Sequence, residues 1–217
     1  MRNKRPGLTR RVLVETALRL LDETGLEGLT VRRLAAELGV QSPALYWHIR
    51  TKQELLDEMA DAIIQAAGMG PPREGETWQD WLCRRATAYR ASLLAHRDGA
   101  RIVATARRLS PETVELFEAE LAAMTSHGFT PAVALRTITT VTYYVNGFVL
   151  QEQSQPEPQD RPHPEPPSPP GLPDPAAMPT LLAAVHQGGN PLGDQAFAHG
   201  LQTLIRGTET SMTGTTR

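Results

Sequence analysis

Apolar residues recur along most of this chain at the spacing of an α-helix. In the first such segment they stand at i, i+4, i+7 and i+8, which puts them on one helical face. These residues are Leu13, Ala17, Leu20 and Leu21. Thr9 is a suitable N-cap for the helix, and Gly25 is a suitable residue to end it. The pattern therefore predicts an amphipathic helix that begins after Thr9 and ends at Gly25.

Two shorter helices follow, and only the residues VQ separate them. One runs from its predicted N-cap, Thr30, to a glycine that ends it, Gly39. The next has Ser42 as its predicted N-cap and Pro43 at the first helical position, where the fixed φ of proline suits a helix. Two short helices joined by a tight bend form the helix-turn-helix pattern.

A further helix is predicted from Thr51, which forms a capping box with Glu54. Glycine and proline then interrupt the helical pattern in the stretch GMGPPREGE, which begins at Gly68. We therefore expect a domain boundary at about residue 68. It separates a three-helix helix-turn-helix domain, residues 1–68, from a C-terminal domain, residues 69–217.

The C-terminal domain is also predicted to be helical. Pro111 and Pro131 fit the first helical positions after the N-caps Ser110 and Thr130. The segment 131–153 is rich in β-branched residues, but its length and its cap favour a buried helix over a strand. The expected helices lie near residues 77–95, 98–107, 111–127, 131–153, 177–187 and 193–211. The chain as a whole is therefore predicted to be all-α, with about ten helices.

One segment departs from the helical pattern. Residues 155–175 hold 10 of the 18 prolines of the chain. No helix or strand interior tolerates that density. The composition predicts a flexible, solvated loop with polyproline II character, and a connector is a better interpretation than a proline-rich recognition motif.

Charge is distributed unevenly along the chain. The net charge is −2, which alone argues against nucleic acid as a partner. Residues 1–52, however, carry 10 Lys or Arg and 5 Asp or Glu, a net of +5, and the remainder carries 12 and 19, a net of −7. A basic head on an acidic body indicates a head that binds an anion. A basic tail with otherwise random charge is the alternative interpretation.

The composition also indicates in which cellular compartment the protein is expected. Cys83 is the single cysteine, which excludes a disulfide framework and favours an intracellular protein. No apolar run approaches the 18 residues of a membrane span. The basic first ten residues are not followed by the apolar segment of a secretory signal. The expected location is the cytoplasm.

An enzyme is the first alternative from another functional class. The sequence has no G-x-G-x-x-G, no P-loop, no H-E-x-x-H and no G-x-S-x-G motif. Cys83 has no nearby basic partner of the catalytic kind, and His48 has no second His or Cys at metal-ligand spacing. We therefore expect no catalytic activity, no cofactor and no metal site.

The stretch GVQSPALYWHIRTK, which begins at Gly39, has the features of a helix that enters DNA. The major groove is about 12 Å wide and admits one helix. The end that meets the bases needs small or polar residues, and this segment offers Gln41, Ser42, Pro43 and Ala44. Leu45 and Ile49, at i and i+4, are expected to anchor the helix in the core. The residues expected to donate to phosphate oxygens are Tyr46, His48 and Lys52. Trp47 fits either the core or the outer face.

The stretch GLEGLTVRRLAAELGVQSPALYWHIRTKQELLD resembles the DNA-binding domain of the TetR family of bacterial transcription regulators. The positions that carry the resemblance are Gly25, Thr30, Leu34, Ala35, Leu38, Gly39, Val40, Leu45, Tyr46, His48, Lys52 and Leu55. The body is similar to the tetracycline-repressor branch of that family through GETWQDWL, LLAHRDGARI, GFTPAVAL and FAHGLQTLIRG. The resemblance implies an all-helical homodimer that binds a palindromic operator in double-stranded DNA and pairs through the helices at 131–153 and 193–211.

The resemblance also implies roles for residues of the head. Arg32 matches a base-contacting arginine, and Pro43 and Tyr46 match contacts of the recognition helix. Thr30, His48 and Lys52 match phosphate contacts. Ser42 and Ala44 stand where this branch has a glutamine and a threonine that contact bases, so the operator sequence is expected to differ. The expected DNA-binding residues are Thr30, Arg32, Arg33, Gln41, Ser42, Pro43, Ala44, Tyr46, His48 and Lys52.

The tetracycline repressors bind a drug–Mg²⁺ chelate, and only some of the residues that form their binding pocket have counterparts in this sequence. Val103 stands where they have a metal-binding histidine, and Gln151 stands at a metal-shell glutamate. Valine cannot ligate a hard cation, and an amide is a weaker ligand than a carboxylate, so we expect no response to Mg²⁺–tetracycline. The expected effector-binding residues are Arg85, Tyr89, Val103, Arg107, Glu120, Tyr143, Asn146 and Gln151. Arg85 and Glu120 are alternatively ordinary solvated charges, and Tyr143 is alternatively a core residue.

The expected function is that of a ligand-responsive DNA-binding regulator, a repressor that a small organic effector releases from its operator. The same resemblance implies that ligand binding near 98–107 would move that helix and push the helix at 51–67. The two recognition helices would then lose the separation of about 34 Å that successive major grooves require. The alternatives are an activator, or a helical DNA-binding regulator without a small-molecule effector that a partner protein controls.

Overall fold

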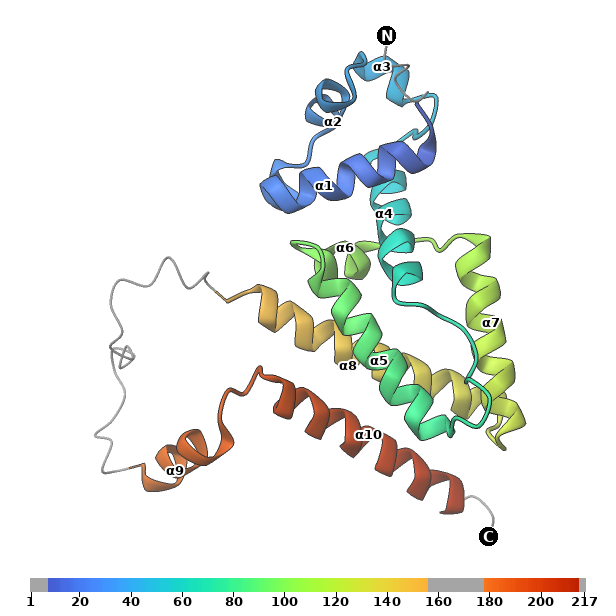
Figure 1. Ribbon diagram of the computed structural model, residues 1–217, viewed down its shortest axis with the longest axis vertical. Helices are drawn as coiled ribbons and strands as arrows, with labels where there is room; N and C mark the ends of the chain where they lie inside the picture. Colours follow the sequence, from blue (N-terminus) through green and yellow to red (C-terminus); the bar gives the residue numbers. More distant parts are fainter. Residues whose placement is uncertain (1–7, 156–177, 215–217) are drawn as a thin grey trace.

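The structure is a computed structural model that describes residues 8–155 and 178–214. In these residues the regular secondary structure is helical (Figure 1). In chain order the helices are α1 (Arg10–Gly28), α2 (Val31–Leu38), α3 (Ser42–Leu45), α4 (Lys52–Ala66), α5 (Trp78–Leu94), α6 (Gly99–Thr105), α7 (Pro111–Ser126), α8 (Pro131–Gln153), α9 (Pro179–Gly188) and α10 (Asp194–Gly214). The predicted all-α fold with about ten helices is confirmed. The proline-rich segment predicted over 155–175 lies, beyond Gln155, outside the described residues.

Most helices begin at a short polar residue that caps the first turn. The hydroxyl oxygens of Thr9, Thr30 and Thr51 each accept a hydrogen bond from the backbone N–H three residues further on, at 3.2, 3.2 and 3.0 Å. Ser110 and Thr130 do the same in the body, at 3.2 and 3.4 Å. These five predicted N-caps are confirmed.

Two glycines shape the ends of the first helices. Gly39 adopts the left-handed conformation, with φ 67°, and ends α2 where the sequence predicts. Gly25 also leaves the helical conformation, with φ 68° and ψ 173°. The chain then makes one more helical turn, so α1 extends to Gly28 instead of stopping at Gly25.

The third helix differs from its prediction. Ser42 is its first residue and not its N-cap, because Gln41 has the extended backbone (φ −82°, ψ 145°) that an N-cap requires. The Gln41 side chain makes no capping hydrogen bond. The helix is only four residues long and ends at Leu45. Packing of buried side chains, and not capping, must therefore hold this short helix in place.

The first four helices form a head at one end of the molecule (Figure 1). α1 packs on α2 and α4, and α2 packs on α3. Apolar side chains from all four helices fill its core and are at most 2% exposed: Leu13, Leu21, Leu34, Leu45 and Leu55. The position of α3 therefore depends on a common core with α1, α2 and α4.

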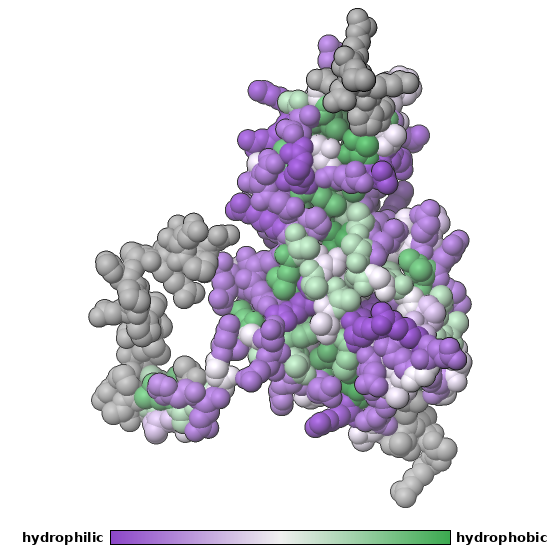
Figure 2. Space-filling view, viewed as in Figure 1, coloured by the Kyte–Doolittle hydropathy of each residue, from purple (hydrophilic) through white to green (hydrophobic). Residues whose placement is uncertain are grey.

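The remaining helices form the body. α5 packs on α8 and α10, and α7 packs on α8. α6 lies between the head and the body and packs on α4, α5 and α8. α9 stands away from the other helices in Figure 1. Figure 2 shows mostly hydrophilic side chains on the visible face of the head, with apolar side chains surfacing where the head meets the body. None of the helices in residues 8–155 and 178–214 is long and apolar enough to cross a membrane.

Polar contacts join α1 to the turn between α5 and α6. The backbone N–H of Leu26 donates to the carboxylate of Asp98 at 2.8 Å, and the N–H of Arg97 donates to Asp22 at 2.9 Å. The His96 ring lies 3.1 Å from the same Asp22 carboxylate. Asp98 itself has a positive φ of 58°, which aspartate tolerates better than most residues. The head is thus attached to the body through α4 and through this turn.

Gly99, the first residue of α6, is predicted to be irreplaceable. A Cβ atom at this position would lie 2.2 Å from the carbonyl oxygen of Leu93, a backbone atom that cannot turn aside. We expect Gly99→Ala to lower the free energy of unfolding by about 1–3 kcal/mol, the usual cost of inserting an extra carbon atom into a tightly packed site. Thermal unfolding followed by circular dichroism measures the effect, with Ala104→Ser on the exposed side of α6 as the control. An unchanged melting temperature for Gly99→Ala would contradict it.

Candidate functional site

The surface of the head carries two large aromatic side chains next to each other. Tyr46 is 53% exposed and Trp47 is 90% exposed, whereas Leu45 and Ile49 are buried. Leu45 and Ile49 are four residues apart and point to the same side, so Trp47 between them points to the other. Trp47 therefore belongs to the outer face and not to the core.

Two cationic side chains near α3 have no hydrogen-bond or ion-pair partner among the described residues. Arg32 on α2 and Lys52 at the start of α4 are both exposed. Neither makes a side-chain hydrogen bond or ion pair with any described residue, and the same holds for the Tyr46 hydroxyl. Arg33 differs, because its guanidinium donates to the carbonyl oxygen of Gly28 at 3.4 Å. Arg32, Lys52 and Tyr46 are therefore available as donors to a partner outside the chain.

The other expected DNA-binding residues lie around the same surface. Gln41 and Pro43 are exposed, and Ser42, Ala44 and His48 are half-buried. Thr30 is exposed as well, while its hydroxyl caps α2. The structure thus brings the predicted set together around α3 and the first turns of α2 and α4, where the side-chain donors of Arg32, Lys52 and Tyr46 have no partner among the described residues.

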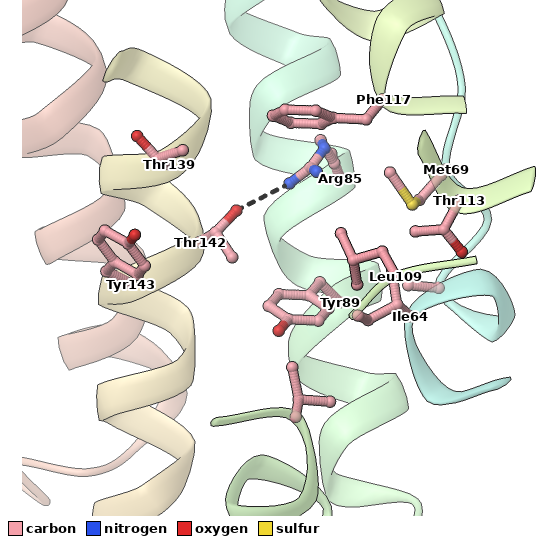
Figure 3. A pocket seen from close by; sticks show the side chains of 12 residues that line it. Ile64, Met69, Arg85, Tyr89, Leu109, Thr113, Phe117, Thr139, Thr142 and Tyr143 are labelled. Carbon is pink, nitrogen blue, oxygen red and sulfur yellow. Dashed lines mark hydrogen bonds between the residues drawn. The ribbon is translucent and has the colours of Figure 1, made fainter. Parts of the chain in front are cut away.

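A second site lies inside the body, where α4, α5, α6, α7 and α8 surround a cavity of about 250 Å³ (Figure 3). Its walls are mostly apolar. The lining residues are Ile64, Ala67, Met69, Arg85, Tyr89, Val103, Leu109, Thr113, Phe117, Thr139, Thr142 and Tyr143. A largely apolar cavity with a few convergent polar groups is the usual form of a small-molecule site.

Arg85 is the charged group of this lining. Its guanidinium lies 2.9 Å from both carboxylate oxygens of Glu120, a residue of α7 that is completely buried. One oxygen of Glu120 also accepts a hydrogen bond from the backbone N–H of Gly70, at 3.1 Å. The remaining Arg85 donor points toward Thr142 at a long distance of 3.4 Å, the dashed line in Figure 3. The carboxylate of Glu120, which lies behind the pocket wall, therefore neutralises the charge of Arg85.

Tyr89 supplies a second polar group. Burial raises the pKa of its hydroxyl to about 12, with a smaller opposing effect of the nearby Asn146 amide. The hydroxyl therefore stays protonated at neutral pH and remains able to donate a hydrogen bond. The Asn146 oxygen is buried without a hydrogen-bond partner among the described residues. Of these two groups, Tyr89 belongs to the pocket lining and can donate a hydrogen bond to a polar ligand atom.

Only part of the expected effector-binding set lies in this lining: Arg85, Tyr89, Val103 and Tyr143. Arg107 is exposed, and its backbone N–H bonds to Asp57 beside the joint of the head and the body. Gln151 is also exposed, whereas Glu120 and Asn146 lie behind the wall. The alternative that Arg85 and Glu120 are solvated surface charges is wrong, because Glu120 is fully buried.

The sequence does not single out several residues that shape the site. Phe117, Leu109 and Met69 line the pocket, but apolar residues at helical spacing look like ordinary core. Gln153 fixes the turn before α6, because its amide nitrogen donates to the carbonyl of His96 at 2.8 Å and its oxygen accepts from the N–H of Ala100 at 3.2 Å. No local sequence pattern around Gln153 predicts these hydrogen bonds.

Comparison with known proteins decides the family. Residues 13–59 match the model of bacterial regulatory proteins, tetR family, and residues 71–212 match the tetracyclin repressor-like C-terminal domain. The chain belongs to the TetR family. It is 38% identical over 207 residues to the class D tetracycline repressor protein of Escherichia coli, which covers 95% of this chain and 91% of that relative.

Solved TetR-family structures agree with the fold. A TetR variant from Acinetobacter baumannii AYE in complex with minocycline is 33% identical, covers 97% of both chains and superposes with a TM-score of 0.77. BioQ bound to its natural double-stranded DNA operator is 29% identical, covers 93% of this chain and 98% of its own, and gives a TM-score of 0.64. As a TetR-family member, this protein is a DNA-binding transcription regulator.

Proposed function

We propose that this protein is a homodimeric repressor, located in the cytoplasm, that a small organic effector releases from a palindromic operator. The observation that carries the proposal is the position of the pocket. Its walls include Ile64 and Ala67 at the end of α4 and Val103 of α6. α4 and α6 are also the helices that connect the body to the head. A ligand that changes the fit of these walls acts directly on the support of the recognition helix.

Release follows from a shift between two arrangements of the dimer. Two recognition helices enter successive major grooves only when they stand about 34 Å apart. An effector that fits the pocket better at another spacing favours the arrangement that does not bind DNA. To move the equilibrium from 1:99 to 99:1, its affinities for the two arrangements must differ by about 5.5 kcal/mol.

The dimer is proposed to pair through α8 and α10, the helices expected from 131–153 and 193–211. α8 presents Leu135, 43% exposed, and Tyr143, 74% exposed, on its surface. Large apolar and aromatic side chains that remain exposed in one chain are suited to an interface between two. The domain boundary near residue 68 is part of the same proposal, because the head binds DNA and the body pairs and binds the effector.

A regulator without a small-molecule effector, controlled by a partner protein, is the second candidate. A body that served dimerisation alone would have its interior filled by side chains. The largely apolar cavity of about 250 Å³ favours the ligand-gated repressor. Activation in place of repression would be seen as increased transcription from the bound promoter.

The proposal is tested with an operator selected from random DNA duplexes by the purified dimer. Candidate compounds are titrated against the operator complex while fluorescence anisotropy of the labelled duplex is followed. Val103→Trp, which fills the cavity from α6, serves as the variant that should lose the response. If no compound lowers operator affinity, or if Val103→Trp responds like the wild type, release through this pocket is excluded.

Tetracycline with Mg²⁺ is expected to leave the operator complex intact. Val103 offers no metal ligand in the pocket, and Gln151 is exposed outside the lining. No group of three or more His, Cys, Asp or Glu residues suited to a metal occurs in residues 8–155 and 178–214. The anisotropy titration is run with and without MgCl₂, with the class D tetracycline repressor and its own operator as the positive control. Mg²⁺-dependent release of this protein would show the prediction wrong.

A further inference from the structure

The pocket contains a single charged group among the residues described. Eleven of its twelve lining residues are uncharged, and only Arg85 carries a charge. Hydrogen bonds of 2.9 Å tie Arg85 to both oxygens of Glu120. Because Glu120 is completely buried and Arg85 is nearly so, the pair acts inside the protein as a neutral unit.

Glu120 is held in place from two sides. Besides Arg85, it binds the N–H of Gly70, and the carbonyl of Gly70 accepts a hydrogen bond of 2.9 Å from the Trp81 indole. Trp81 is itself fully buried. Glu120 therefore has no room to turn away from Arg85, and a carboxylate left unpaired at this position would be strongly unfavourable.

This arrangement restricts the charge of a ligand. An anionic ligand would have to compete with Glu120 for Arg85, and it would leave one negative charge uncompensated inside the body. A cationic ligand would meet Arg85 at the wall, with Glu120 shielded behind it. The lining offers neither of them a compensating charge.

We propose that the pocket selects electrically neutral, largely apolar ligands over charged ones. The proposal rests on the proposed function, because it names the class of effector for the same pocket.

Two fluorescent dyes with the same aromatic frame test the charge preference. N-phenyl-1-naphthylamine is neutral, and 1-anilinonaphthalene-8-sulfonate adds one sulfonate. Both are titrated into the full-length dimer, and dye fluorescence gives the two dissociation constants. We expect the neutral dye to bind the wild type at least about tenfold more tightly, because the sulfonate would be buried without a counter-charge.

A change at Glu120 separates charge from general apolarity. Glu120→Gln keeps the size of the side chain and an acceptor for Gly70, but it leaves the charge of Arg85 uncompensated. The ratio of the two dissociation constants should then shift toward the sulfonate dye by about tenfold or more. Arg85→Gln together with Glu120→Gln should restore the preference of the wild type. Glu118→Gln, exposed on the same helix, should leave the ratio unchanged.

Circular dichroism shows whether Glu120→Gln is folded. If it is not, Thr142→Lys adds an uncompensated cation to the lining and leaves the 2.9 Å contacts between Arg85 and Glu120 in place, although it removes the long Arg85–Thr142 contact. It should strengthen sulfonate-dye binding by a similar factor. A ratio that stays constant in Glu120→Gln or in Thr142→Lys overturns the proposal.

The failure of this proposal can be told apart from the failure of the proposed function. If Val103→Trp abolishes the binding of both dyes and the wild type prefers the sulfonate dye, the pocket is a ligand site but neutral selection is wrong. If Val103→Trp changes the binding of neither dye, the dyes do not bind in this pocket, and both neutral selection and the ligand site of the proposed function fail. If the neutral dye does not bind the wild type at all, neutral selection alone fails.

Discussion

Arg32→Ala is expected to weaken operator binding by between about thirtyfold and about twenty-thousandfold. Arg32 is exposed on α2 beside the recognition helix, and its guanidinium has no partner in the described part of the chain. A good bidentate contact between an arginine and a base contributes about 1–3 kcal/mol, and a homodimer loses two such contacts, roughly 2–6 kcal/mol. Arg32 makes no contact that the head needs, so the variant should remain as stable as the wild type.

Anisotropy of the selected operator duplex measures the loss. Arg108→Ala, an exposed arginine of the body, is the matched control and should bind the operator like the wild type. Binding to random DNA should fall much less than binding to the operator, because contacts to phosphates persist in the variant. Equal losses on both duplexes would assign Arg32 to the phosphate backbone, and an unchanged affinity would remove it from the interface.

Glu120→Ala is expected to lower the free energy of unfolding by about 3–5 kcal/mol. The change leaves the Arg85 guanidinium without its counter-charge and the N–H of Gly70 without its acceptor. Because Arg85 retains an exposed fraction of 11%, water relieves part of the loss, and the lower end of this range is expected. Destabilisation on this scale is a large share of the stability of an ordinary domain.

Urea denaturation at one fixed protein concentration measures the change, since the stability of a dimer depends on concentration. Glu118→Ala, exposed on the same helix, should stay within about 0.5 kcal/mol of the wild type. Arg85→Gln combined with Glu120→Gln should recover much of the loss, because a neutral pair leaves no buried charge unpaired. If Glu120→Ala is as stable as Glu118→Ala, the ion pair does not hold α7 to α5.

The helices and their starts could be predicted because their signals are local. A threonine or serine hydroxyl lies three residues from the N–H that it caps, as at Thr30 and Ser110, so the sequence contains both partners. The cap of α3 was missed because Gln41 caps through its backbone conformation and not through its side chain. The sequence does not predict whether Trp47 is buried or exposed, because aromatic residues occur both in cores and on binding surfaces.

The pocket could be predicted only where its residues are unusual for a core. Arg85 and Tyr89 were found because of their polar groups, whereas Phe117 has the same periodicity as any buried residue. Contacts between distant segments were beyond sequence reasoning. The bond from Leu26 to Asp98 joins residues 72 positions apart, and no local pattern shows that the two segments meet.

The length of α4 has a consequence for the engineering of sensors. The helix has 15 residues, so its two ends stand about 22 Å apart at 1.5 Å per residue. Lys52 at one end is exposed on the surface that we expect to contact DNA, and Ile64 near the other lines the pocket. The two recognition surfaces therefore share a helix but no side chain. We therefore expect that new effectors can be selected by mutating the lining while the operator stays the same. Exchange of α1–α3, which contribute no lining residue, is expected to change the operator while the response to the effector is retained.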